Sequence, residues 1–269
     1  METRYAPSVS GSLPHDGNER AREETLELGA TSRRRRELPG AEASAQDDTL
    51  AVEAPLELRI EGVPVAILMR TPGADEDLAW GFLRSEGIVQ TREQVVRVRH
   101  CDQVDTPDAE DNVIEIRLAP EAEVDLAGLR RNTYTTSSCG ICGKASREAA
   151  LAVAPPFEAV PTLAEDYGSL AEGLRKVQAL FEQTGAVHAA GLFTREGRLI
   201  CVREDVGRHN AVDKVIGACF REGVDTADTT LMVSGRVYFE VVQKCLAARI
   251  PAIAAVSAPA NCARSRAPR

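Results

Sequence analysis

The chain has 269 residues and a formal net charge of −9, and 43% of its residues are hydrophobic. This length is enough for one large domain or two small ones with a buried core, and the acidic balance argues against general binding to nucleic acid, which favours basic surfaces. No run of about 18 apolar residues is present to span a membrane, and the first residues lack the apolar core of a signal peptide. We therefore expect a cytoplasmic protein with neither nucleic acid nor a membrane as its partner.

The first 46 residues are rich in glycine, serine, proline and charges of both signs, and they show no helical or strand period. This composition predicts a disordered N-terminal tail over residues 1–46. Four consecutive arginines occupy residues 33–36, with acidic residues on both sides. We interpret this run as a solvated part of the tail and not as a binding site.

Residues 47–130 indicate a small α+β module. Apolar and polar residues alternate on both sides of Glu61 and Gly62, which is the signal of a β-hairpin. The next apolar residues recur at helical spacing up to Gly87, a typical helix stop. We expect the hairpin, the helix and two further strands, which are separated by a polar loop, at residues 50–70, 75–87, 94–100 and 112–118.

Residues 131–162 contain a C-x-x-C motif, a helix expected at 144–153 and a proline-containing linker, and residues 163–259 form a second unit. This unit follows the order helix-strand-strand-helix-strand-helix-strand, which predicts a layered α/β fold with helices on the faces of its sheet. Its elements are expected at residues 170–185, 187–193, 198–204, 208–223, 229–235, 236–250 and 252–258.

The seven cysteines are odd in number and scattered, which does not suggest a framework of disulfides. Cys201, Cys219 and Cys245 lie in apolar segments, and we expect them to be small core residues. Cys139 and Cys142 instead lie in the polar stretch "TSSCGICGKAS", just before a predicted helix. The free N–H groups and the dipole of a helix start, together with the neighbouring lysine, favour the thiolate form that nucleophilic attack requires.

Three chemistries remain open for this motif from the residues alone: a redox pair, half of a zinc site, and a nucleophile that carries a group. A zinc site needs two further ligands, but the chain has no second C-x-x-C and only four histidines. A thioredoxin-like pair would directly follow a strand, whereas Ser/Thr-rich residues precede this one. We reject a zinc deaminase, because the sequence His188-Ala189-Ala190 lacks the glutamate of H-x-E and because the cysteines precede that histidine.

Two predicted strand-to-helix turns carry groups that suit an anion. Gly207 permits a tight turn, after which Arg208, His209 and Asn210 open a helix whose free N–H groups favour negative charge. The alternative is a structural role, in which Asp205 and Arg208 pair and Asn210 caps the helix. The next such turn carries Ser234, Gly235 and Arg236, so the two turns together predict a pocket for a phosphorylated ligand at one edge of the sheet.

Five motifs in consistent order resemble the FdhD family of formate dehydrogenase accessory sulfurtransferases. They are "TPGADEDLAWGFLRSEGIV", "TSSCGICGKAS", "VHAAGLF", "REDVGRHNAVDKVIG" and "SGRVYFEVVQKCLAARIPAIAAVSAP", within about residues 48–259. The resemblance implies an α+β N-terminal module joined to a three-layer α/β core of cytidine deaminase type with a mixed sheet.

The resemblance also implies a function. A cysteine desulfurase would load sulfur as a persulfide onto Cys139, with Cys142 as a supporting thiol. The acceptor would be the molybdenum bis(molybdopterin guanine dinucleotide) cofactor of formate dehydrogenase, and no permanently bound metal is implied. The implied partners are the desulfurase, formate dehydrogenase and a second copy of the chain in a homodimer. The alternatives are a cofactor-binding chaperone with incidental cysteines and a zinc-binding structural module.

The C-terminal residues 260–269 depart from the family pattern. Family members continue beyond "AVSAP" with another helix and strand, whereas "ANCARSRAPR" has no apolar period. We expect this tail to be disordered, to leave an edge of the sheet exposed and to weaken cofactor binding.

Overall fold

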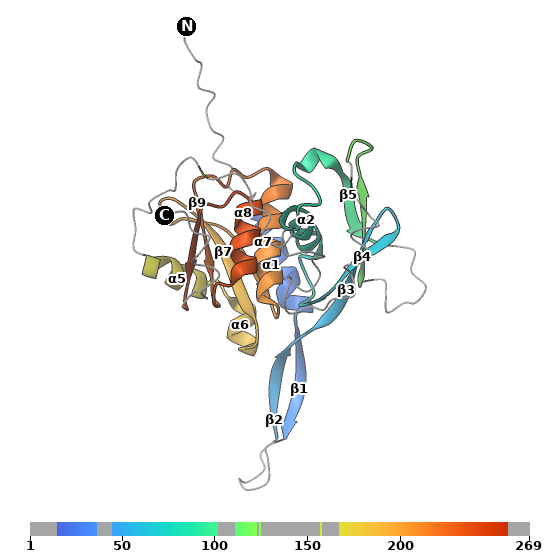
Figure 1. Ribbon diagram of the computed structural model, residues 1–269. Coiled ribbons are helices and arrows are strands. Elements are labelled where there is room, and N and C mark those ends of the chain that lie inside the picture. The colour runs from blue at the N-terminus through green and yellow to red at the C-terminus, as the bar shows by residue number, and fades with distance from the viewer. Residues whose placement is uncertain are drawn as a thin grey trace.

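The computed structural model describes residues 15–36, 45–101, 111–122, 124, 157 and 167–257. Within these residues the chain forms two units, each built on its own sheet, with helices packed between the sheets (Figure 1). The C-x-x-C motif, the helix expected at 144–153, most of the polar loop after residue 100 and the tail at 260–269 lie outside the described residues. No helix in the described ranges is long and apolar enough to cross a membrane.

The first unit is a four-stranded mixed sheet with the strand order β4-β3-β6-β5 and a helix over one face. The hairpin turn has positive φ at both Glu61 (49°) and Gly62 (76°), as a two-residue type I′ turn requires. Alternate strand residues point at the helix, and Leu58, Leu78 and Ile116 are fully buried between them. The predicted elements are confirmed at Ala54–Ile60 (β3), Val63–Arg70 (β4), Asp75–Ser85 (α2), Val95–His100 (β5) and Val113–Leu118 (β6), and a short 3-10 helix, Arg92–Gln94 (η1), precedes β5.

The second unit has the strand order β10-β9-β7-β8, in which β9 and β10 are parallel and the other neighbours are antiparallel. Helix α5 packs on one face through Leu170 and Leu174, and α7 and α8 pack on the other. The prediction of an α/β protein with a mixed sheet between helical layers is confirmed. The elements are Tyr167–Arg175 (α5), Ala179–Thr184 (α6), His188–Thr194 (β7), Leu199–Asp205 (β8), Arg208–Glu222 (α7), Thr229–Val233 (β9), Phe239–Ala247 (α8) and Ala252–Ala255 (β10).

One helix predicted at residues 170–185 is in fact two, because the chain leaves the helical path between α5 and α6. The carboxylate of Glu204 on β8 accepts hydrogen bonds from the backbone N–H groups of Leu180 and Phe181, each at 2.9 Å. These are groups that a helix start leaves unpaired, so Glu204 stabilises a new start for α6.

The core of the second unit contains the three cysteines of the apolar segments. Cys201, Cys219 and Cys245 are at most 1% exposed and lie among the apolar side chains between the sheet and helices α7 and α8. Burial raises the pKa of the Cys245 thiol, which keeps this thiol neutral. The prediction that these residues belong to the core is confirmed.

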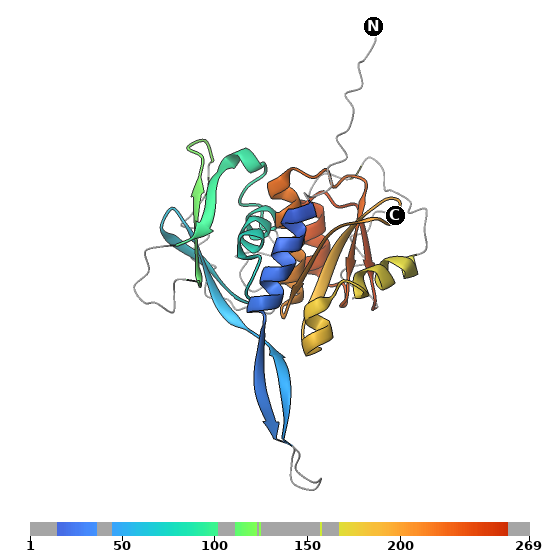
Figure 2. The same ribbon diagram turned by 180° about the vertical axis from the view of Figure 1, so that it is seen from behind.

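The prediction of a disordered tail over residues 1–46 is wrong for the part that the structure describes. Residues His15–Leu28 form helix α1, which lies against both units (Figure 2). Its contacts are largely polar: Glu24 accepts a hydrogen bond from the N–H of Ala74, Asn18 accepts one from Arg203, and Arg22 donates to a carbonyl of the second unit. A helix held by polar contacts shows no apolar stripe, which explains why its composition resembles that of a tail.

The arginine run at residues 33–36 lies on a strand and not in a disordered segment. Strands β1 (Ala30–Arg36) and β2 (Ala45–Ala51) pair antiparallel, so that Arg33 is opposite Asp48 and Arg34 is opposite Asp47. The two strands form a ribbon that projects from the body of the molecule (Figure 1). The pairing joins two segments that are separate in the chain, so the local composition of the arginine run does not reveal it.

Helices α2 and α7 cross at two glycines, and this crossing joins the two units. A Cβ atom at Gly81 would collide with the backbone oxygen of Asp213, and one at Gly217 would collide with the backbone oxygen of Asp77. The two helix backbones are therefore in direct contact, which only glycine permits.

Buried ion pairs flank the crossing and link the units. Arg203 on β8 donates two hydrogen bonds to one carboxylate oxygen of Asp77, at 2.7 and 2.9 Å. Lys244 on α8 lies 2.7 Å from Asp213 on α7, and the hydroxyl of Ser85 at the end of α2 donates to the same carboxylate at 2.7 Å. Losing one partner of such a pair would leave an unpaired buried charge. The Arg203–Asp77 pair and the Ser85–Asp213 hydrogen bond cross from one unit to the other and fix how the units are oriented.

Candidate functional site

The candidate site lies at the edge of the second sheet where β8 and β9 end and β7 begins. Because β7 runs antiparallel to both neighbours, its first residue, His188, is opposite Asp205, the last residue of β8. The turn into α7 and the turn into α8 therefore meet beside His188. As predicted, the two turns lie at one sheet edge: the first carries Arg208, His209 and Asn210, and the second carries Ser234, Gly235 and Arg236.

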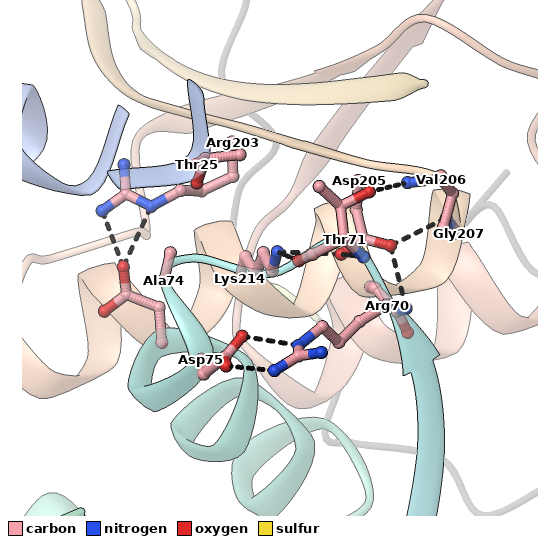
Figure 3. Close-up of polar contacts among 12 residues, drawn as sticks. Thr25, Arg70, Thr71, Ala74, Asp75, Arg203, Asp205, Val206, Gly207 and Lys214 are labelled. Carbon is pink, nitrogen blue, oxygen red and sulfur yellow. Dashed lines mark hydrogen bonds and ion pairs between the residues drawn. The ribbon is translucent and has the colours of Figure 1, made fainter. Parts of the chain in front are cut away.

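Asp205 organises the turn into α7 (Figure 3). One of its carboxylate oxygens accepts hydrogen bonds from the N–H of Gly207 at 2.8 Å and from the side-chain amide of Asn210 at 3.0 Å. The same amide nitrogen donates to the carbonyl of Met69 at 2.7 Å. Both donors of the Asn210 amide group are thus used to hold the turn and the end of β4. Asn210 supports the site, and its amide nitrogen is not free for a ligand.

The other oxygen of Asp205 pins the first unit to the turn. It lies 2.8 Å from the ammonium group of Lys214 and accepts a hydrogen bond from the N–H of Thr71 at 3.1 Å. Lys214 also donates to the carbonyl of Thr71 at 2.8 Å, and the Thr71 hydroxyl accepts from the N–H of Val206 at 3.0 Å. Asp205 therefore pairs with Lys214 and not, as the structural alternative had it, with Arg208.

Arg208, Arg236 and His209 are further basic side chains at this sheet edge. The guanidinium of Arg208 lies 4.5 Å from the centroid of the Tyr238 ring, and its buried Nε atom has no hydrogen-bonding partner among the described residues. Arg236 on the neighbouring turn is exposed. Nε2 of His209 is 3.5 Å from a carboxylate oxygen of Glu240 at the start of α8. Two arginines, one with an unsatisfied donor, fit an anionic group such as a phosphate.

The turn into α8 places its backbone close to the edge of β7. Ser234 donates its N–H to the carbonyl of Ala189, and its hydroxyl accepts the N–H of the same residue, both at 2.9 Å. A Cβ atom at Gly235 would be 3.4 Å from Nδ1 of His188. Ser234 thus extends the pairing of β7 with β9, and Gly235 leaves room for the imidazole.

His188 belongs to this edge, although the sequence motif assigned it no role there. Burial, Arg208 and His209 lower the pKa of His188, and Asp205 opposes them. The imidazole is consequently neutral at neutral pH. The signal that could have located it is the antiparallel order of β7 and β8, which places the start of one beside the end of the other.

A metal centre is not built by these side chains: in the described ranges no group of three or more His, Cys, Asp or Glu could hold an ion. The arrangement can instead bind anions, through two arginines and the starts of two helices. Cys139 and Cys142, for which the sequence predicts the sulfur chemistry, lie outside the described residues, so their distance to this edge stays untested.

Comparisons with known proteins agree on the family. The model of the FdhD/NarQ family matches residues 51–269. A "Sulfur carrier protein FdhD" from Mycobacterium tuberculosis is 45% identical over 245 residues, which cover 88% of this chain and 89% of that protein. The protein of the same name from Streptomyces avermitilis is 46% identical over 230 residues, which cover 82% and 80%.

The fold has a solved counterpart. The crystal structure of a protein proposed to be a formate dehydrogenase accessory protein, from Desulfotalea psychrophila, matches with a TM-score of 0.67 and covers 88% of each chain at 23% identity. At that identity the match supports the fold. The family model and the relatives together show that this chain belongs to the FdhD/NarQ family.

Proposed function

We propose that the protein is a sulfur carrier for the maturation of a formate dehydrogenase and that it carries sulfur as a persulfide on Cys139. The observation that carries this proposal is the similarity over most of the chain to proteins named as sulfur carriers. The sheet edge adds support, because two arginines and two helix starts suit an acceptor that contains phosphates.

Sulfur enters by thiol exchange. The Cys139 thiolate attacks the outer sulfur of a persulfide on a cysteine desulfurase, the sulfur–sulfur bond of the desulfurase breaks, and its cysteine leaves as a thiolate. One sulfur–sulfur bond forms as one breaks, so this step needs no outside oxidant or reductant.

Cys142 has a role in release. Its thiolate can attack the inner sulfur of the Cys139 persulfide, which forms a Cys139–Cys142 disulfide and expels hydrosulfide. The two thiols are oxidised and the carried sulfur is reduced, so electrons balance, and an external dithiol restores the pair. The hydrosulfide is then transferred to the molybdenum bis(molybdopterin guanine dinucleotide) acceptor.

The chain's own residues would position that acceptor. Arg208 and Arg236 would bind its phosphates, while Asp205, Lys214 and Asn210 hold the turn in place. The resemblance also implies a homodimer and a cytoplasmic location, and both stay predictions.

The persulfide can be tested directly. Incubation with a cysteine desulfurase and cysteine should add the mass of one sulfur atom to the peptide that contains Cys139, measured by mass spectrometry without reductant. Cys139→Ala should abolish the added mass. Cys142→Ala should keep it but lose the release of hydrosulfide.

Cys101→Ala supplies the matched control, because Cys101 is a partly exposed cysteine directly after β5. This variant should load sulfur like the wild type. Loading that depends on Cys101, or that survives in Cys139→Ala, would contradict the assignment of the carrier cysteine.

A further inference from the structure

The proposed function gives no role to His188, although this residue lies at the same sheet edge as Asp205. Its ring packs against the backbone of Gly235, at the meeting point of the two turns. It is only partly buried, and within the described chain no hydrogen bond involves its ring. A half-buried imidazole with unused nitrogens, near enough to Arg208 for the two to interact electrostatically, is placed to contact an anion that Arg208 binds.

Charged groups of the turn into α7 act on His188, and further charged groups lie on the turn into α8 and at the start of α8. Asp205, Arg208 and His209 from the turn into α7 act on the ring electrostatically. Arg236 lies in the turn into α8, and Glu240 lies at the start of α8, where it faces His209. In the free protein burial, together with Arg208 and His209, outweighs Asp205, so the ring holds no proton at neutral pH.

We propose that His188 is a further ligand-binding residue of this edge, which takes up a proton when a phosphorylated nucleotide binds and then donates a hydrogen bond to it. The proposal rests on the proposed function, because that function supplies a nucleotide-containing acceptor. It adds a residue and a proton to the binding step.

The direction of the effect follows from charge. A bound phosphate adds negative charge beside the imidazole and offsets Arg208, so the pKa of His188 is higher in the complex than in the free protein. The protonated protein therefore binds the nucleotide more tightly. The additional affinity is complete below the pKa of the free protein and is lost as pH rises through the pKa of the complex.

Guanosine diphosphate is a suitable probe for the full-length protein, with isothermal titration calorimetry in buffers of different ionisation enthalpy. The wild type should bind roughly three- to tenfold more tightly at about pH 6 than at about pH 8 and should take up more protons than His188→Asn. The phosphate of the probe titrates equally in both titrations, so the difference between them reports His188. His188→Lys, which is charged throughout, should bind tightly at both values.

His100→Asn is the control, because His100 is a partly exposed histidine of the first unit, 3.6 Å from Asp75. It should keep the pH dependence of the wild type. The same pH dependence and proton uptake in His188→Asn as in the wild type would overturn the role of His188 and leave the nucleotide site intact. No binding by the wild type at either pH would overturn the nucleotide site itself, whereas sulfur loading on Cys139 is measured separately.

Discussion

Replacement of Asp205 by alanine should lower the free energy of unfolding by about 3–5 kcal/mol, because it leaves the charge of Lys214 buried without a partner. Both side chains are fully buried, and their ion pair is 2.8 Å long. Asp205 also accepts from Thr71, Gly207 and Asn210, so the substitution leaves further buried donors unsatisfied.

Urea denaturation can separate the pair from its surroundings. Lys214→Met should cost a similar amount, whereas Asp205→Ala combined with Lys214→Met should cost clearly less than the sum of the two. Asp225→Ala is the matched control, since Asp225 accepts an exposed hydrogen bond from the N–H of Ala227, and its loss should cost less than about 1 kcal/mol. Additive costs for the pair would contradict the coupling described here.

Replacement of Gly217 by alanine should lower the free energy of unfolding by about 2 kcal/mol. Alanine gains about 1 kcal/mol of helix propensity, but its methyl group collides with the backbone of α2 and forces the helices apart, at a cost of about 3 kcal/mol. Because this crossing joins the two units, we also expect faster proteolysis between them.

Gly173→Ala tests whether the loss of stability in Gly217→Ala comes from the helix crossing and not from replacing a glycine as such. Gly173 is also in a helix, α5, but a Cβ atom there would lie 3.5 Å from the Phe193 ring, an ordinary contact distance. This variant should be as stable as the wild type or more stable by up to about 1 kcal/mol. Equal losses at Gly217 and Gly173 in thermal or urea unfolding would refute a close crossing.

The sequence predicted those elements whose stability comes from apolar periodicity. The hairpin around Glu61 and helix α2 bury one face, so their spacing is visible in the residue order. Strands β7 and β9 are buried on both faces and are visible instead as continuous apolar runs. The site edge was predictable for a related reason, because the turns after β8 and β9 each lead into a helix in an alternating α/β pattern.

The missed features depend on contacts between residues far apart in the chain. Helix α1 is held by polar pairs such as Asn18 with Arg203, and the start of α6 depends on Glu204 of β8. Asp205 pairs with Lys214 and not with Arg208. This arrangement involves Thr71 of the other unit, whose backbone forms hydrogen bonds with the side chains of Asp205 and Lys214. Local composition carries no record of such partners.

His188 illustrates the same limit within the candidate site. In the sequence, His188 begins a predicted strand and belongs to a segment that lacks the glutamate of a deaminase. In the structure, the antiparallel register places it beside Asp205 and the two turns. The tertiary register, and not its neighbours in the chain, places His188 at the edge that we propose to bind an anion.

The central claim, that the protein acts by carrying sulfur on Cys139, is tested most directly by complementation of a strain that lacks its own sulfur carrier of this family. Formate dehydrogenase activity would be measured with the wild type and with Cys139→Ala at equal protein levels. The account predicts that the wild type restores the activity and that Cys139→Ala does not. Full activity with Cys139→Ala would contradict it and would favour a cofactor-binding chaperone whose cysteines are incidental.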